Sequence, residues 1–120
     1  MDKFLITGPC QIKGKVTIAP SKNSAIPILA STLLFDKPVV IKNLPRVKDI
    51  DTMISLLRSL GSKIILSKNS RTAKIINRKK MNTVAKYSIV KKMRGSFLVL
   101  GPLIAKFNNS KCSLPGGCSF

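Results

Sequence analysis

The chain has 120 residues, enough for one small domain, and 44% of them are hydrophobic, which excludes an intrinsically disordered protein. Its charge is extreme, because 22 Lys and Arg stand against four acidic residues, for a formal net charge of +18. The sequence has no His, so a Ser-His-Asp triad is excluded, and its three Cys lack a metal-binding spacing. We expect a cytoplasmic protein with no secretory signal, no membrane segment, and no metal or organic cofactor.

Three explanations of the positive charge stay open. An AT-rich coding sequence favours Lys, Ile and Asn, which are all abundant here, so the charge can be compositional. A polyanion such as nucleic acid is the usual partner of a very basic chain, although one Tyr and no Trp leave little to stack on bases. The third explanation is that the charge serves an anionic small substrate.

The first third of the chain predicts two strands, a helix and a third strand. Residues 3–7 and 14–19 have strand character, because apolar and polar residues alternate in the second of these segments. Ser21 is a candidate N-cap, and apolar residues recur at helical spacing through residues 21–35. Residues 38–42 are β-branched and apolar, which favours a strand.

The clearest helical pattern spans residues 49–60. Asp49 is a candidate N-cap, and Gly61 stands where a helix would stop. The apolar residues repeat at the spacing of one helix face: Ile50, Met53, Ile54, Leu57 and Leu60.

The second half predicts a hairpin and a long helix. Residues 63–67 and 73–77 read as two strands joined by a polar turn, and residues 78–86 are basic and irregular. A helix is predicted over residues 88–106, broken or bent near the Gly101-Pro102 dipeptide.

A weak internal repeat links the two halves. The order helix, Phe35, polar turn, short strand and Leu-Pro occurs once before residue 46. The same order follows from the last helix through Phe107 to Leu114. Repeated units of this kind favour an architecture assembled from copies of one module.

Three residues are candidates for binding an anion. Lys22 and Asn23 fall in the first turn of a predicted helix, where free backbone N–H groups favour negative charge. Arg94 lies among apolar neighbours, so we expect its guanidinium to emerge beside the core, where it can bind a carboxylate or phosphate. The alternatives are a solvated Lys, a capping amide and an ordinary surface Arg.

Two further residues have candidate roles in chemistry. Asp49 can act as a cap, a charge partner or a proton handler. Cys118 follows two glycines, and a thiol on such a loop in a positive field can act as a nucleophile or a general acid. We interpret Cys10 and Cys112 as structural.

Four ordered motifs together resemble the N-terminal part of the UDP-N-acetylglucosamine 1-carboxyvinyltransferase family, which is related to the enolpyruvylshikimate phosphate synthases. The resemblance runs from Met1 to Phe120. The motifs are APSKNSAIPILA (19–30), LPRVKDIDTMISLLRSLGSKI (44–64), KKMRGSFLVLGPLIAKF (91–107) and SLPGGCSF (113–120).

The resemblance implies a mixed α/β (α+β) fold of inverse α/β barrel type, built from strand-helix-strand-helix-strand-strand units and ending early in the second unit. It implies that residues 1–21 form a strand pair that packs with a C-terminal domain, and that residues 22–120 begin the N-terminal domain. The implied reaction transfers enolpyruvyl from phosphoenolpyruvate to the 3′-hydroxyl of UDP-N-acetylglucosamine, releases phosphate and begins peptidoglycan synthesis.

Site roles follow residue by residue from the same resemblance. Lys22 and Asn23 match a pair that contacts phosphoenolpyruvate and the sugar nucleotide, and Arg94 matches an Arg that binds UDP-N-acetylglucosamine. Cys118 matches the loop thiol that donates a proton, forms an adduct with phosphoenolpyruvate and is alkylated by fosfomycin. Asp49 matches an acidic residue near the cleft. No nucleic acid or membrane partner is implied.

Two substitutions depart from the family pattern, since Pro20 replaces a Gly and Gly95 replaces an Ala. We also expect the 120 residues alone to be inactive, because the family's second domain and general base are not among them. A separately encoded remainder would then be a partner. The alternatives are a non-functional remnant and a basic nucleic-acid-binding module.

Overall fold

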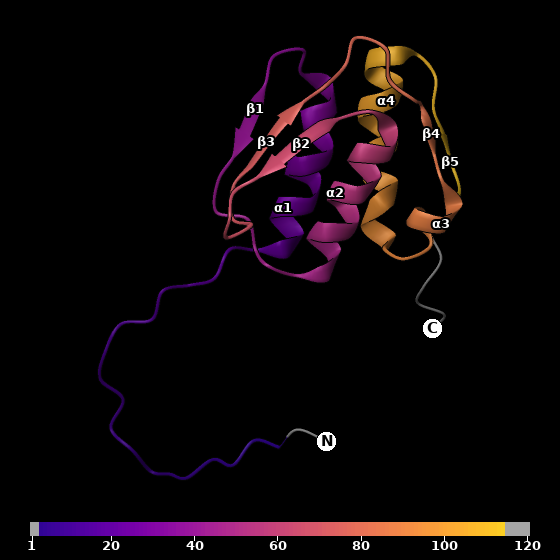
Figure 1. Cartoon of the computed structure of the whole chain (residues 1–120). Coiled ribbons are helices and arrows are strands. Elements are labelled where there is room, and N and C mark those ends of the chain that lie inside the picture. The colour runs from indigo at the N-terminus through magenta and orange to yellow at the C-terminus, as the bar shows by residue number, and fades with distance from the viewer. Residues whose placement is uncertain (1–2, 115–120) are drawn as a thin grey trace.

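The computed structural model describes residues 3–114, as a folded body preceded by an extended segment (Figure 1). Residues 3–20 belong to no helix or strand, so the strands predicted at 3–7 and 14–19 are wrong for this chain. Their apolar side chains face solvent, with Phe4 98% exposed. A strand is stable only where its backbone pairs, and no strand of the described residues lies beside this segment.

A three-stranded sheet forms one layer of the folded body. Its strands are β1 (Val39–Ile41), β2 (Lys63–Leu66) and β3 (Ala73–Ile76), in the order β1-β3-β2, with both pairs antiparallel. All three lie within the predicted segments, so these strands are confirmed. The helices lie together on one side of this sheet (Figure 1).

The first helix, α1 (Lys22–Ser31), continues into a 3₁₀ turn, η1 (Thr32–Leu34). Ser21 is its N-cap as predicted, because the Ser21 hydroxyl accepts a hydrogen bond of 3.3 Å from the Ser24 N–H. Ala25, Ile26, Leu29 and Ala30 are its buried face.

The second helix, α2 (Lys48–Leu60), ends at Gly61 as predicted, with φ 113° at that glycine. Its N-cap is Val47 rather than Asp49, which corrects the capping assignment. The helix starts one residue earlier than its apolar pattern indicated, so Asp49 lies in the first turn. There its carboxylate still faces the positive end of the helix dipole.

The predicted long helix over residues 88–106 is three shorter elements: α3 (Tyr87–Val90), η2 (Arg94–Val99) and α4 (Leu100–Phe107). The break falls at residues 91–93, where Met93 is extended, and not at the Gly101-Pro102 dipeptide. The first turn of α4 contains Pro102.

A second, smaller sheet pairs β4 (Val84–Ala85) with β5 (Lys111–Cys112) in parallel. The chain passes from β4 through the helical segment 87–107 and returns in β5, so the connection is a strand-helix-strand crossover. β5 is the short strand predicted after Phe107.

The core lies between the helices and the inner face of the larger sheet. Its apolar side chains come from every helix and from β3, which explains why the helices hold one arrangement. The largest side chains that are almost fully buried are Leu29, Leu33, Leu44, Met53, Leu56, Leu57, Leu60, Ile75, Val90, Val99 and Leu103.

Polar contacts fix the segment that follows α1. Asn77 Nδ2 donates hydrogen bonds to the carbonyl oxygens of Thr32, at 2.6 Å, and Phe35, at 3.1 Å. Lys106 Nζ on α4 lies 2.8 Å from Asp36 Oδ1. The hydrogen bond and charge of Lys106 lower the pKa of the Asp36 carboxyl. These contacts join α1 and η1 to both β3 and α4.

Gly61 allows a direct test of the helix stop. Its φ of 113° is a left-handed conformation, so we expect Gly61→Ala to lower the free energy of unfolding by about 1 kcal/mol. Gly101→Ala is the matched control, because Gly101 has open space around it and an ordinary helical conformation. We expect the control to raise stability by about 0.5 kcal/mol. Urea unfolding of both variants measures the difference, and equal effects would contradict the assignment.

Candidate functional site

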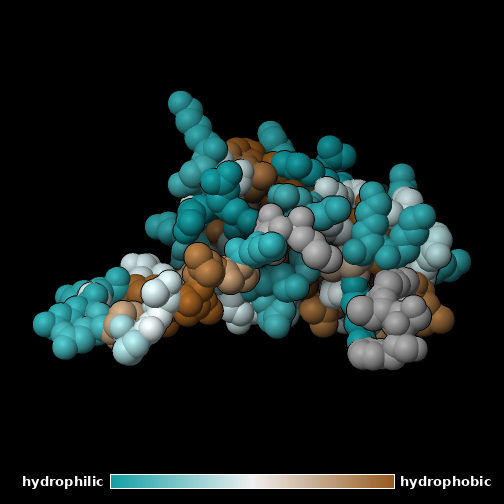
Figure 2. Space-filling view, turned by 90° about the horizontal axis from the view of Figure 1, so that it is seen from below, coloured by the Kyte–Doolittle hydropathy of each residue, from teal (hydrophilic) through white to brown (hydrophobic). Residues whose placement is uncertain are grey.

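The first turns of α1 and α2 and the start of η2 gather at one end of the folded body, the lower end in Figure 1. β5 runs toward the same end, since it is parallel to β4, which leads into α3 there. Seen from this end, the surface of the body is largely hydrophilic, with hydrophobic patches (brown) among the hydrophilic areas (Figure 2). Free backbone N–H groups of helix starts make such an end favourable for anions.

Lys22 and Asp49 meet at this end. Lys22 Nζ on α1 lies 2.8 Å from Asp49 Oδ2 on α2, and their side chains are 45% and 35% exposed. The structure therefore joins two residues that the sequence proposed separately, and Asp49 acts as a charge partner. An ion pair this exposed adds between about 0 and 1 kcal/mol of stability, so its main effect is to orient the Lys22 ammonium.

Lys22 stands in a position that helix electrostatics disfavours. The first turn of α1 contains a Lys and no acid, whereas the first turn of α2 contains Asp49 and Asp51. A cation at a helix N-terminus is repelled by the helix dipole. Local conflicts of this kind are expected where a side chain serves a ligand rather than the fold.

Arg94 is the first residue of η2, which packs against α1. An atom added at the Cβ position of Gly95 would lie 3.0 Å from Ile26 Cγ2, so only a glycine permits this approach without adjustment. Ile26 lies one helical turn after Lys22 and on the same face of α1. The close contact therefore brings the backbone of Arg94 to the end of the molecule that carries Lys22.

The environment of Arg94 differs in part from the prediction. Met93 is buried, but Arg94 itself is exposed, and Phe97 and Leu98 are 41% and 46% exposed. The Arg94 side chain therefore follows a buried residue but is itself exposed to solvent. No salt bridge to Arg94 occurs among residues 3–114, so its charge is available to a ligand.

The internal repeat gives Lys22 and Arg94 matching places. Lys22 precedes Phe35 by 13 positions, and Arg94 precedes Phe107 by the same number. Each basic residue opens a helical run, α1–η1 or η2–α4, and each run is followed by a short strand. The matching positions explain why both basic side chains appear at one end.

The other candidate residues are Asn23 and the three cysteines. Asn23 is exposed in the first turn of α1, next to Lys22. Cys118 lies outside the described residues, whose last member, Leu114, follows β5. Cys112 is partly buried in β5, and burial raises the pKa of its thiol, in keeping with a structural role. Cys10 is exposed in the extended segment, so its structural role stays a prediction.

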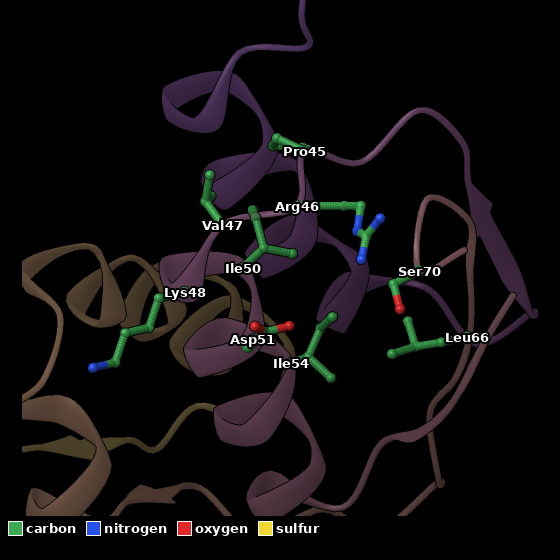
Figure 3. A pocket seen from close by; sticks show the side chains of 9 residues that line it. All are labelled: Pro45, Arg46, Val47, Lys48, Ile50, Asp51, Ile54, Leu66 and Ser70. Atoms are coloured by element: carbon green, nitrogen blue, oxygen red, sulfur yellow. The ribbon is translucent and has the colours of Figure 1, made fainter. Parts of the chain in front are cut away.

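A pocket of about 280 Å³ lies on the other side of the α2 start (Figure 3). Asp51 rather than Asp49 faces it, because residues two apart on a helix point in different directions. Arg46 and Ser70 border it, and Lys48 extends away from the other labelled side chains (Figure 3). It contains neither Lys22 nor Arg94 and is separate from the candidate site.

The described residues contain no cluster of three or more His, Cys, Asp or Glu that could hold a metal ion. Within the same part of the chain, no helix has the length and apolar content needed to cross a bilayer.

Comparison with known proteins gives the family. The family described as EPSP synthase (3-phosphoshikimate 1-carboxyvinyltransferase) matches residues 6–120, which is nearly the whole chain. The chain therefore belongs to the EPSP synthase family.

Within that family, the chain is similar to proteins named UDP-N-acetylglucosamine 1-carboxyvinyltransferase. It is 53% identical over 119 residues to the one from Pelagibacter ubique and 44% identical over 119 residues to the one from Acinetobacter baylyi. Each alignment covers 99% of this chain and 28% of the relative, so the chain spans little more than a quarter of the relatives' length.

The fold also matches a solved structure, the enolpyruvyl transferase NikO from Streptomyces tendae. The TM-score is 0.64 at 19% sequence identity, over 72% of this chain and 20% of that protein. A likeness at this identity concerns the fold alone. It confirms the predicted mixed fold of helices and strands as a part of an enolpyruvyl transferase domain.

The contact between Gly95 and Ile26 yields a test of how the site is positioned. We expect Gly95→Ala to destabilise the chain by about 1 kcal/mol, because the new methyl group presses on Ile26 Cγ2. Ile26→Leu keeps the side-chain volume but removes the Cγ2 methyl group at Cβ. In the Leu background, Gly95→Ala should become neutral or stabilising, because Ala has the better helix propensity.

A double-mutant cycle of urea unfolding energies measures this coupling. We expect the unfolding free-energy changes of the two substitutions to be non-additive by about 1 kcal/mol. Strict additivity would show that the two helical segments do not meet at this point.

Proposed function

We propose that this chain contributes one wall of the active site in an enzyme that transfers enolpyruvyl from phosphoenolpyruvate to the 3′-hydroxyl of UDP-N-acetylglucosamine. The observation that carries the proposal is that Lys22 and Arg94 open matching helical runs at one end of the fold. The relatives' names give the substrate class. The reaction would release phosphate and begin peptidoglycan synthesis.

The electrostatics of this end suit two anionic substrates. The phosphate and carboxylate of phosphoenolpyruvate would bind Lys22 and Asn23, where the start of α1 adds backbone N–H donors. The diphosphate of UDP-N-acetylglucosamine would bind Arg94, whose planar guanidinium can hold two oxygens at once. Asp49 would hold Lys22 in place until the substrate's negative charge arrives.

The chemistry requires a proton donor as well as charge. When the 3′-hydroxyl oxygen adds to C2 of phosphoenolpyruvate, C3 must gain a proton, and loss of phosphate with a proton from C3 then restores the double bond. We assign the donor to Cys118, which would also form the covalent adduct with phosphoenolpyruvate and react with fosfomycin. The two glycines before Cys118 would let its loop close over the substrates and reopen.

The extended segment has a place in the same proposal. Residues 1–21 would pair as strands with a second domain, while residues 22–120 belong to the first. The exposure of Phe4, Ile6, Val16 and Ile18, all at least 88% exposed, supports this, because alternating apolar side chains need a partner surface. The substrates would place the enzyme in the cytoplasm.

A chimera tests the proposed function. Residues 1–120 replace the matching segment of the Acinetobacter baylyi relative, and phosphate release is measured with both substrates. We expect an active enzyme. Arg94→Ala should raise the KM for UDP-N-acetylglucosamine by about tenfold or more, and Lys22→Ala should lower kcat/KM by about 100-fold.

Lys91→Ala is the matched control, because Lys91 is an exposed cation three residues before Arg94. Its kinetic constants should stay within about twofold of the chimera's own. A folded chimera without phosphate release, or a loss at Lys91 equal to that at Arg94, would contradict the proposed function.

A further inference from the structure

Ser96 has a buried hydroxyl that makes no hydrogen bond to any of residues 3–114. The residue lies in η2, two positions after Arg94, and is 0% exposed, so bulk solvent does not reach the hydroxyl either. A buried hydroxyl without a partner is unfavourable, and an Ala would fill nearly the same space without that cost. A Ser here therefore calls for a partner that the present conformation does not supply.

Other hydroxyls of the helical runs indicate which partner this is. A helical Ser or Thr often donates to the carbonyl oxygen three or four residues back. Five hydroxyls of this chain do so, at 2.6 to 3.0 Å: Ser31, Thr32, Thr52, Ser55 and Ser59. For Ser96 the carbonyl three residues back is that of Met93. In this structure the Met93 carbonyl accepts a hydrogen bond of 3.0 Å from the Ser96 N–H instead.

The winding of η2 determines which N–H takes the Met93 carbonyl. η2 is a 3₁₀ helix of six residues, whereas 3₁₀ runs longer than three or four residues are uncommon because their hydrogen-bond geometry is poorer. In a 3₁₀ turn each N–H bonds the carbonyl three residues back, so the donor is Ser96. In an α turn each N–H bonds the carbonyl four residues back, so the donor would be Phe97. Since α4 follows η2 directly, the whole run of residues 94–107 can be α-helical.

An anion at the start of this run favours the α winding. In the 3₁₀ form the N–H groups of Arg94 and Gly95 have no partner within the helix, and in the α form the N–H of Ser96 is released as well. An anion held by Arg94 therefore gains a hydrogen-bond donor only in the α form. A ligand shifts a conformational equilibrium only through such a difference between the two states.

We propose that Ser96 is a positioning residue for Arg94, whose hydroxyl replaces its own N–H on the Met93 carbonyl when an anion binds. The first turn of η2 then changes from 3₁₀ to α winding. The rise per residue falls by about 0.5 Å, so Arg94 moves by about 2 Å toward α4 over the four residues of the turn. The inference rests on the proposed role of Arg94 as a ligand of the diphosphate of UDP-N-acetylglucosamine.

The packing around the run permits this movement at its start and not at its end. The end is fixed, because Lys106 Nζ donates to the Leu33 carbonyl oxygen at 3.1 Å and lies 2.8 Å from Asp36 Oδ1. At the start, Arg94 is exposed and Gly95 has no side chain to press on α1. Met93 is the extended N-cap of η2, so it can stay buried in both windings.

The first experiment identifies the hydrogen-bond donor directly in the chain labelled with ¹⁵N and ¹³C. A scalar coupling across a hydrogen bond shows which amide donates to the Met93 carbonyl. We expect the Ser96 amide in the free chain and the Phe97 amide at saturating UDP-N-acetylglucosamine. A Ser96 coupling that persists in the bound chain, or no shift of residues 94–97 at any ligand concentration, would overturn the proposal.

Substitutions in the active chimera separate a positioning role from a structural one. Ser96→Ala should raise the KM for UDP-N-acetylglucosamine by about fivefold and leave kcat within about twofold. The Tm of the chain should not fall, because the free state makes no hydrogen bond with this hydroxyl. Ser59→Ala is the matched control: it removes a hydroxyl that already donates to the Leu56 carbonyl, so the Tm should fall and the KM should stay unchanged.

The possible failures are distinguishable. An unchanged KM for Ser96→Ala in an active chimera would contradict the positioning role and leave the proposed function intact. A lower Tm for Ser96→Ala would show that the hydroxyl already has a partner, such as a buried water, and would also overturn the inference. An inactive chimera would contradict the proposed function, and the amide couplings would then decide the role of Ser96 by themselves.

Discussion

The close packing of α1 against η2 determines where the two principal basic side chains lie. At Ile26 and Gly95 the two segments approach so closely that an added methyl group would lie 3.0 Å from its neighbour. Lys22 begins one segment and Arg94 begins the other. A shift of either segment would therefore change the separation of the two cations that we propose as ligands of two anionic substrates.

The lysines of this molecule differ in their surroundings. Most of its lysines stand singly on the surface, but Lys22 occupies a helix start that repels it and depends on Asp49 across a 2.8 Å ion pair. The protein has a formal net charge of +18 and only four acidic residues. The presence of one of them beside Lys22 indicates that the orientation of this lysine matters.

Much of the fold followed from local pattern. The helix at residues 49–60 and the strands beside it were predictable, because apolar periodicity and Gly61 act within a few residues. The break at residues 91–93 was not, because Met93 is buried by tertiary packing that a helical pattern does not reveal. The strand prediction for the extended segment before α1 was wrong for a related reason. Strand propensity alone forms no sheet when the segment has no strand to pair with.

The residues of the candidate site were predictable from the sequence, but their arrangement in space was not. Lys22, Asn23 and Arg94 could be named from helix starts and motifs, yet the pairing of Lys22 with Asp49 depends on how α1 meets α2. From the sequence, Gly95 was only a departure from the family pattern, in which an Ala stands at this position. The structure instead shows it as the residue that lets η2 approach α1.

The most direct test of this account is a titration of the ¹⁵N-labelled chain with phosphoenolpyruvate and with UDP-N-acetylglucosamine in turn, followed by amide chemical shifts. If the two helix starts bind the two substrates as proposed, phosphoenolpyruvate should shift the amides of residues 22–24 and UDP-N-acetylglucosamine should shift those of residues 94–96. Shifts scattered over the surface lysines with both ligands would contradict the account.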